Sequence, residues 1–84
     1  MAVLTETVVY RGGMRGSGLK YLVMEVSDAT AADTVPVGEL DTIKDTIAFR
    51  LDTGAEVDCT EATNVVTIGS GPSSTPMLII VSGW

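Results

Sequence analysis

Almost the whole chain consists of short runs of β-branched and aliphatic residues separated by turn residues, and this pattern limits the folds open to it. Residues 46–52 alternate most clearly between apolar and polar side chains. A period of two is typical of a strand with one buried face, and no segment keeps the 3.6-residue period of an amphipathic helix. The pattern predicts an all-β fold, namely a small, mostly antiparallel β-sandwich or β-barrel of about six to eight short strands.

Turn residues place the expected strands. Clusters of Gly, Pro, Asp, Asn and Ser favour turns, and the segments between them are expected as strands at residues 5–10, 20–27, 34–37, 46–52, 56–60, 64–68 and 77–81. Residues 39–44 fit either a helical turn or a short strand, and residues 69–76 are expected to form a loop. Pro36 has no backbone N–H, so its strand is expected at a sheet edge or beside a bulge.

The alternation also predicts which side chains form the core. The expected inward-facing residues are Leu22, Met24, Val26, Ile47, Phe49, Leu51, Val66, Ile68, Leu78 and Ile80. Residues 77–81 are apolar at every position, which is expected of a strand that is buried on both faces or covered by another subunit. Residues 1–84 are expected to form one domain, and a domain of this size buries only about 60% of its unfolded surface, so shared interfaces would supplement its core.

Charge is distributed unevenly along the chain. The net charge is −6, but residues 1–20 carry Arg11, Arg15 and Lys20 against Glu6 alone, whereas residues 21–84 carry two basic residues against ten acidic ones. An acidic body repels phosphate groups, so we expect no nucleic-acid partner. The basic, glycine-rich segment 11–20 is a candidate for attachment to an acidic surface or to a copy of the same chain.

The candidate partner-binding residues lie in this segment and at the end of the sequence. They are Arg11, Gly12, Gly13, Met14, Arg15 and Trp84. The glycine-rich segment fits a wide hairpin loop or a mobile arm, and its arginines are suited to pairing with carboxylates of a partner. Trp84 fits either a frayed end or an interfacial anchor, because tryptophan is enriched in binding hot spots.

Cysteine content and hydropathy exclude some classes of protein. Cys59 has no second cysteine to pair with, so no internal disulfide is expected, and its acidic neighbours favour a half-buried strand residue over a reactive thiol. The apolar run at residues 77–81 is too short to span a bilayer, and the first four residues are too short for a signal peptide. We expect no membrane association. We also expect the protein to be made and used, or assembled, in a reducing cytoplasm.

One short motif carries possible catalytic chemistry. Residues 50–57 resemble the active-site stretch of retroviral-type aspartic proteases, which implies Asp52 as a catalytic acid/base in a homodimer. Only about 30 residues follow the motif, Arg50 stands where that family has an apolar residue, and Asp-Thr-Gly is favourable hairpin-turn chemistry. We therefore expect a turn and no enzyme. Without histidine, no Ser-His or Cys-His pair is possible.

No metal ion or cofactor is expected. Asp52, Glu56 and Asp58 could gather oxygen atoms for a weak Ca²⁺ site, but their spacing matches no calcium-binding loop, and a solvated acidic face is the preferred interpretation.

A resemblance to a known family covers most of the chain. It is carried by residues 4–10, 42–49, 54–57 and 64–68 and by the apolar strand near the end of the sequence. Together these segments resemble the small all-β decoration, or cement, proteins of tailed-bacteriophage heads. The resemblance implies a non-enzymatic virion structural protein that binds the major capsid protein or another virion protein and forms a homo-oligomer, with a trimer favoured. A phage tail or fibre module, or another protein-binding β-module, is the alternative.

Overall fold

The all-β prediction is confirmed. The structure is a computed structural model that describes residues 3–5, 7–13 and 18–84, and these residues form eight strands and no helix. The strands are β1 (Thr7–Gly13), β2 (Lys20–Ala29), β3 (Thr34–Pro36), β4 (Ile43–Arg50), β5 (Glu56–Val57), β6 (Cys59–Ala62), β7 (Val65–Ile68) and β8 (Thr75–Gly83). In the described ranges, no helix is long and apolar enough to cross a membrane. The helical turn considered for residues 39–44 is not formed: residues 39–42 belong to the irregular connection after β3, and strand β4 begins at Ile43.

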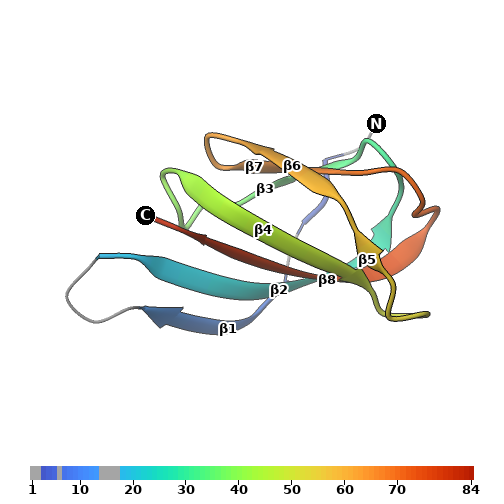
Figure 1. Cartoon of the computed structure of the whole chain (residues 1–84), viewed down its shortest axis with the longest axis horizontal. Coiled ribbons are helices and arrows are strands. Elements are labelled where there is room, and N and C mark those ends of the chain that lie inside the picture. Colours follow the sequence, from blue (N-terminus) through green and yellow to red (C-terminus); the bar gives the residue numbers. More distant parts are fainter. Residues whose placement is uncertain (1–2, 6, 14–17) are drawn as a thin grey trace.

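The strands form two antiparallel sheets that lie one above the other (Figure 1). The larger sheet has the order β1-β2-β8-β4-β5, and the smaller one has the order β3-β7-β6. Strand β8, the last along the chain, therefore lies at the centre of the larger sheet, between β2 and β4. Strand β3, which contains Pro36, is an edge strand of the smaller sheet, as its missing N–H predicts.

Two of the corners at which the chain passes between the two sheets bring the edges of the sheets close together. At one corner, Val3 bridges to Thr34 of β3 and the backbone N–H of Leu4 donates to the Thr34 carbonyl at 2.7 Å, before the chain continues into β1 of the larger sheet. At the other corner, Asp58 separates β5 in the larger sheet from β6 in the smaller one. The strand predicted at residues 56–60 is thus divided in two, and the sandwich is partly closed towards a barrel.

The core lies between the two sheets. Its buried apolar residues are Leu22, Met24, Val26, Ala29, Val35, Val37, Leu40, Ile43, Ala48, Val57, Val66, Ile68, Met77, Ile79 and Val81. Five predicted core residues are among them, from β2 and β7. In those strands one set of alternate positions is apolar and faces the other sheet, as a half-buried strand requires.

The predicted inward faces of β4 and β8 are wrong. Ile47 and the neighbouring Leu51 are 41% and 48% exposed, and Phe49, Leu78 and Ile80 are only partly buried. The side chains that face the core are instead Ala48 in β4, and Met77, Ile79 and Val81 in β8. Strand β8 is apolar at both sets of positions, so alternation alone could not choose between its faces. Pairing with β2 and β4 made the choice, and a change of one residue reverses the face of every side chain.

Candidate functional site

An apolar row crosses the outer face of the five-stranded sheet, the face turned away from the smaller sheet. Cross-strand pairing places Tyr10 of β1 beside Val23 of β2, Val23 beside Ile80 of β8, and Ile80 beside Ile47 of β4. Directly opposite residues in antiparallel strands point to the same face of a sheet. Tyr10 is 57% exposed, and Val23 and Ile80 are partly buried. One continuous row therefore crosses four strands. It is here called the apolar row and consists of Tyr10, Val23, Ile80 and Ile47.

A second row lies alongside it and combines apolar and acidic side chains. In this row Glu25 of β2, Leu78 of β8 and Phe49 of β4 are successive cross-strand partners. Thr7 of β1 and Glu56 of β5 continue it at the two ends. Together with the apolar row, these residues give the outer face an apolar centre with carboxylates among and beside the apolar groups. The contiguous apolar centre is the feature that marks this face as a candidate protein-binding surface.

Two tyrosines cover the β1 side of this face. The rings of Tyr10 and Tyr21 have centroids 5.9 Å apart with an interplanar angle of 33°, and a hydrogen bond with Tyr10 raises the pKa of Tyr21. The Tyr21 ring occupies the space into which a Cβ at Gly12 would project. Gly12, predicted as a partner-binding residue, thus has a clear internal role, because its missing side chain makes room for an aromatic ring on the neighbouring strand.

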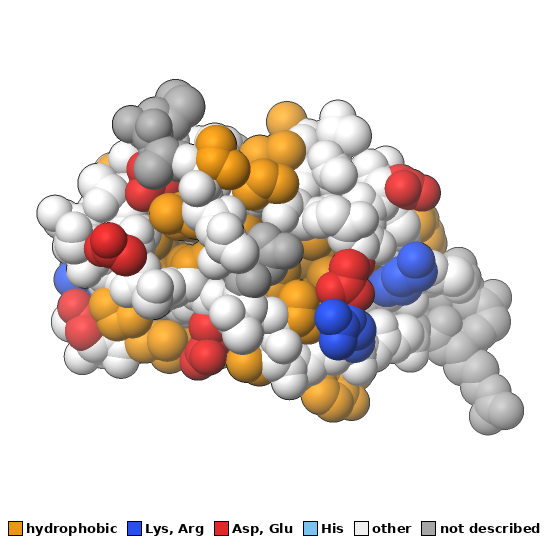
Figure 2. Space-filling model, turned by 180° about the vertical axis from the view of Figure 1, so that it is seen from behind, with side chains coloured by type: hydrophobic (Ala, Val, Ile, Leu, Met, Phe, Trp, Pro, Cys, Tyr) orange, Lys and Arg blue, Asp and Glu red, His pale blue; other side chains and the backbone are white. Residues whose placement is uncertain are grey.

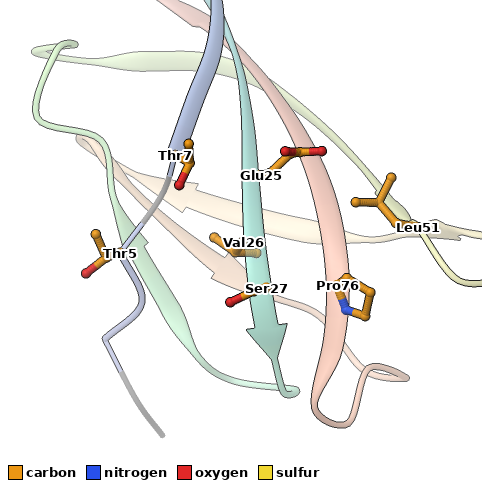
Figure 3. A pocket seen from close by; sticks show the side chains of 7 residues that line it. All are labelled: Thr5, Thr7, Glu25, Val26, Ser27, Leu51 and Pro76. Carbon is orange, nitrogen blue, oxygen red and sulfur yellow. The ribbon is translucent and has the colours of Figure 1, made fainter.

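A hollow of about 330 Å³ lies at one end of the outer face (Figure 3). Its lining residues are Thr5, Thr7, Glu25, Val26, Ser27, Leu51 and Pro76. They offer hydroxyl groups, apolar groups and a single carboxylate. Among the described lining residues, Glu25 is the one titratable side chain. The hollow extends the outer face and offers polar and apolar contacts of the kind that a protein partner uses.

Arg11 is held by a partner within the chain. Its Nε and Nη2 atoms donate to the two carboxylate oxygens of Glu39, at 2.6 and 2.9 Å. This hydrogen-bonded pair raises the pKa of Arg11 and lowers that of Glu39. The residues from Arg11 to Gly13 belong to β1 and pair with β2, so this part forms a hairpin strand and not an arm. Met14 and Arg15 lie outside the described residues.

Among the described side chains, no broad basic patch is seen on the side of the molecule shown in Figure 2. Two basic side chains lie beside an acidic one in this view, and further acidic side chains are spread over the rest of it with apolar side chains among them. This view therefore gives no support for a purely basic attachment surface made by the described residues.

Trp84 follows β8, the central strand of the larger sheet, and its backbone pairs with the residue before β4. Its backbone N–H donates to the carbonyl of Thr42 at 3.0 Å, and its own carbonyl accepts from the N–H of Thr42 at 3.0 Å. The backbone is thus paired and not frayed. The side chain is 44% exposed, and the ammonium group of Lys44 lies 6.0 Å from the centroid of a Trp84 ring, within range of a cation–π interaction. Trp84 remains a candidate contact residue.

Asp52 occupies a hairpin turn between β4 and β5, as the turn chemistry predicts. The Arg50 guanidinium donates to both Asp52 oxygens, at 3.1 and 3.0 Å, and lowers the pKa of this exposed carboxyl. Gly54 has φ 77°, in the left-handed region that glycine accepts readily, and its N–H donates to the Arg50 carbonyl at 2.8 Å. An exposed aspartate paired with arginine differs from the buried carboxylates of a protease dyad, which share one proton.

Two other sequence-based candidates can be placed. Cys59 is half-buried in β6, as predicted, and burial raises the pKa of its thiol, with Asp58 and Glu61 adding to the effect and the Gly69 backbone opposing it. Within the described part of the chain, no group of three or more Cys, Asp or Glu side chains is arranged to hold a metal ion. Asp52, Glu56 and Asp58 are therefore not brought together as a calcium site.

The sequence analysis named no residue of the outer face as a partner-binding residue, although it expected the strand at residues 77–81 to be buried on both faces or covered by another subunit. The one signal for it was the run at residues 77–81, where a strand with one solvated face would carry alternate polar residues. Comparisons with protein-family models, with curated proteins and with solved structures found no match to this chain.

Proposed function

We propose that this chain is a non-enzymatic structural protein that acts through protein–protein contacts made by the outer face of its five-stranded sheet. One observation carries the proposal. The apolar row from Tyr10 to Ile47 crosses four strands, and its two end residues are 57% and 41% exposed. Contiguous exposed apolar surface on a small domain marks a binding site more often than isolated apolar residues do.

The virion is the proposed setting, and this part rests on the sequence resemblance. Decoration proteins of phage heads are small all-β domains that attach to the major capsid protein, and the all-β fold of this chain agrees with that class. The partner is accordingly the major capsid protein or another virion protein, and the protein is assembled in the host cytoplasm. A tail or fibre module of similar architecture remains the alternative function.

The test is to look for the protein on particles. Virions purified from the source of this sequence should contain the chain by mass spectrometry, and cryo-electron microscopy should show it repeated over the outer surface of the head. Density at the tail or fibre would support the alternative. Absence from the particles, with the protein found only in the host-cell lysate, would refute a structural role in the virion.

A binding measurement tests the surface itself. Tyr10→Ser and Phe49→Ser each remove an aromatic side chain from the outer face. Binding is measured on particles from which the protein is absent, and each substitution should lower the affinity by about tenfold or more, as expected of aromatic contact residues. Val9→Ser is a matched control, because Val9 is 50% exposed at the β1 bulge, outside the two rows. Equal attachment by all four proteins would exclude the outer face as the contact surface.

A further inference from the structure

We propose that the outer face of the five-stranded sheet is a two-fold interface between two copies of this chain. The proposal rests on the proposed function, because it names a second copy of this chain as the protein that the outer face binds. Its basis is the residue pattern of β8, the size of the face and the positions of its acidic side chains.

Strand β8 carries the first argument. On its inner side, Met77, Ile79 and Val81 are fully buried in the core. On its outer side, Leu78 and Ile80 are flanked by β2 and β4 and are still only partly buried. A central antiparallel strand with one face in water normally alternates apolar and polar residues. The apolar residues on both sides of β8 indicate that the outer face is covered in the assembled protein.

The size of the face is sufficient for a pair. Strands β1, β2, β8 and β4 contain 7, 10, 9 and 8 residues. At a spacing of about 4.8 Å between strands and about 3.3 Å per residue, four such strands present about 500 Å² per copy. Two copies would bury about 1,000 Å², the lower limit for a specific interface. A weak but specific dimer is therefore expected.

The acidic side chains are compatible with a two-fold axis that runs along β8 between the two faces. This axis places β2 of one copy over β4 of the other. Asp45 of β4 shares a row with Ser82 of β8 and Tyr21 of β2. The axis therefore places Asp45 opposite Tyr21 of the second copy, whose hydroxyl group can donate a hydrogen bond to the carboxylate. By the same symmetry, Glu25 lies opposite Phe49 of the second copy.

Glu56 completes this comparison. It is at the β5 end of its row, and Thr7 is at the β1 end. The axis along β8 exchanges these two ends, so Glu56 meets a hydroxyl side chain. None of the described acidic residues in the rows is placed against an acidic residue of the second copy. Two copies of a chain with a net charge of −6 could bring carboxylates into repulsive contact, and this two-fold arrangement avoids such contacts.

The experiment is sedimentation velocity on the full chain, at concentrations from the micromolar range to about 1 mM, which spans the affinity expected for an interface of this size. We expect a concentration-dependent monomer–dimer equilibrium. Ile47→Glu places a carboxylate in the apolar row of both copies and should raise the dissociation constant by about tenfold or more. Val3→Glu is the matched control, since Val3 is 73% exposed beside the smaller sheet and the charge change is the same.

Mixing two variants tests the direction of the axis. Ile47 and Val23 flank Ile80 in the apolar row, so the axis along β8 places each opposite the other in the second copy. Ile47→Glu and Val23→Lys should each be monomeric alone, and their mixture should form a one-to-one heterodimer. Circular dichroism establishes that each variant is folded. A mixture of folded variants that stays monomeric would overturn the proposed pairing.

Other results of the sedimentation and particle-binding experiments would also refute the proposed pairing. A monomer over the whole concentration range, a trimer, or a dimer that Ile47→Glu leaves unchanged would each refute it. A monomeric protein that still binds particles, and loses this binding on Ile47→Glu, would show that a virion protein occupies the outer face. That outcome refutes the pairing of two copies and leaves the proposed function standing.

Discussion

Arg11 and Glu39 are 28 residues apart in the chain and form a two-pronged ion pair, with Nε donating to Oε1 at 2.6 Å. Arg11 lies on β1, the edge of the larger sheet, and Glu39 lies in the turn between β3 and β4. The pair ties the outermost strand of one sheet to a turn that leads out of the other. It also gives a residue that the sequence suggested for partner binding a function within the fold.

The ion pair predicts a loss of stability in acid. Arg11 lowers the pKa of Glu39 in the folded state, so the pair stabilises the fold above the ordinary carboxyl range and this stabilisation is lost as the pH falls below about 4. Glu39→Gln should lower the urea midpoint at pH 7 slightly and reduce its change between pH 7 and pH 3. Glu61→Gln, at an exposed carboxylate of β6, is the control. Parallel pH profiles for Glu39→Gln and the unaltered protein would contradict this prediction.

Gly69 is required where the chain crosses between the sheets. A Cβ at this position would collide with the carbonyl oxygen of Asp58, a backbone atom that cannot move without shifting β5 or β6. Gly69→Ala should therefore destabilise the protein by about 2–4 kcal/mol, measured by urea unfolding. At Gly38 a Cβ would meet open space, so Gly38→Ala should change stability by less than about 0.5 kcal/mol. Equal effects of the two substitutions would show that the close approach at Asp58 is not important.

Asp52 should carry no protease activity. Arg50 lowers its pKa, so this exposed carboxylate is ionised at about pH 5, where an aspartic dyad would share a proton. Asp52→Asn should weaken the turn between β4 and β5, seen as a small drop in the thermal midpoint. Assays for peptide cleavage should find none for either protein. Turnover that a pepstatin-type inhibitor blocks, and that Asp52→Asn abolishes, would establish the protease interpretation instead.

Cys59 should react slowly with alkylating reagents. Burial and the nearby carboxylates of Asp58 and Glu61 raise the pKa of its thiol, and only the thiolate is nucleophilic. At pH 7.5 the rate with iodoacetamide should be about tenfold or more below that of a cysteine-containing peptide. Asp58→Asn should increase the rate by removing one nearby negative charge. Alkylation as fast as that of the free peptide would show that Cys59 is open to solvent in the folded protein.

The arrangement of strands and turns could largely be predicted from the sequence. β2 has apolar residues at Leu22, Met24 and Val26 and a glutamate between the last two, so its buried face follows from local pattern. The turn at Gly54 and the edge position of Pro36 follow from backbone chemistry that is specific to those residues. These features need no knowledge of the neighbouring strands.

The candidate site depended on contacts that the sequence does not reveal. The role of Gly12 became clear only when β1 and β2 were paired, because the ring that it accommodates belongs to Tyr21. Arg11 could be identified as a cation, but not as the partner of Glu39, since the two meet only after the sheets pack. Local pattern does not encode such contacts between distant segments.

The sequence by itself determined that this chain forms short antiparallel strands, because alternation and turn residues act over a few neighbouring positions. Only the tertiary structure decided which faces of β4 and β8 are buried. β8 is apolar on both sides, and in β4 the small Ala48 faces the core while Ile47 faces outward. Cross-strand pairing with β2 fixed that choice, since Met24 pairs with Ile79 and Val23 with Ile80. The same pairing left the apolar row on the outer face, because one residue of register separates the core of this protein from its candidate binding surface.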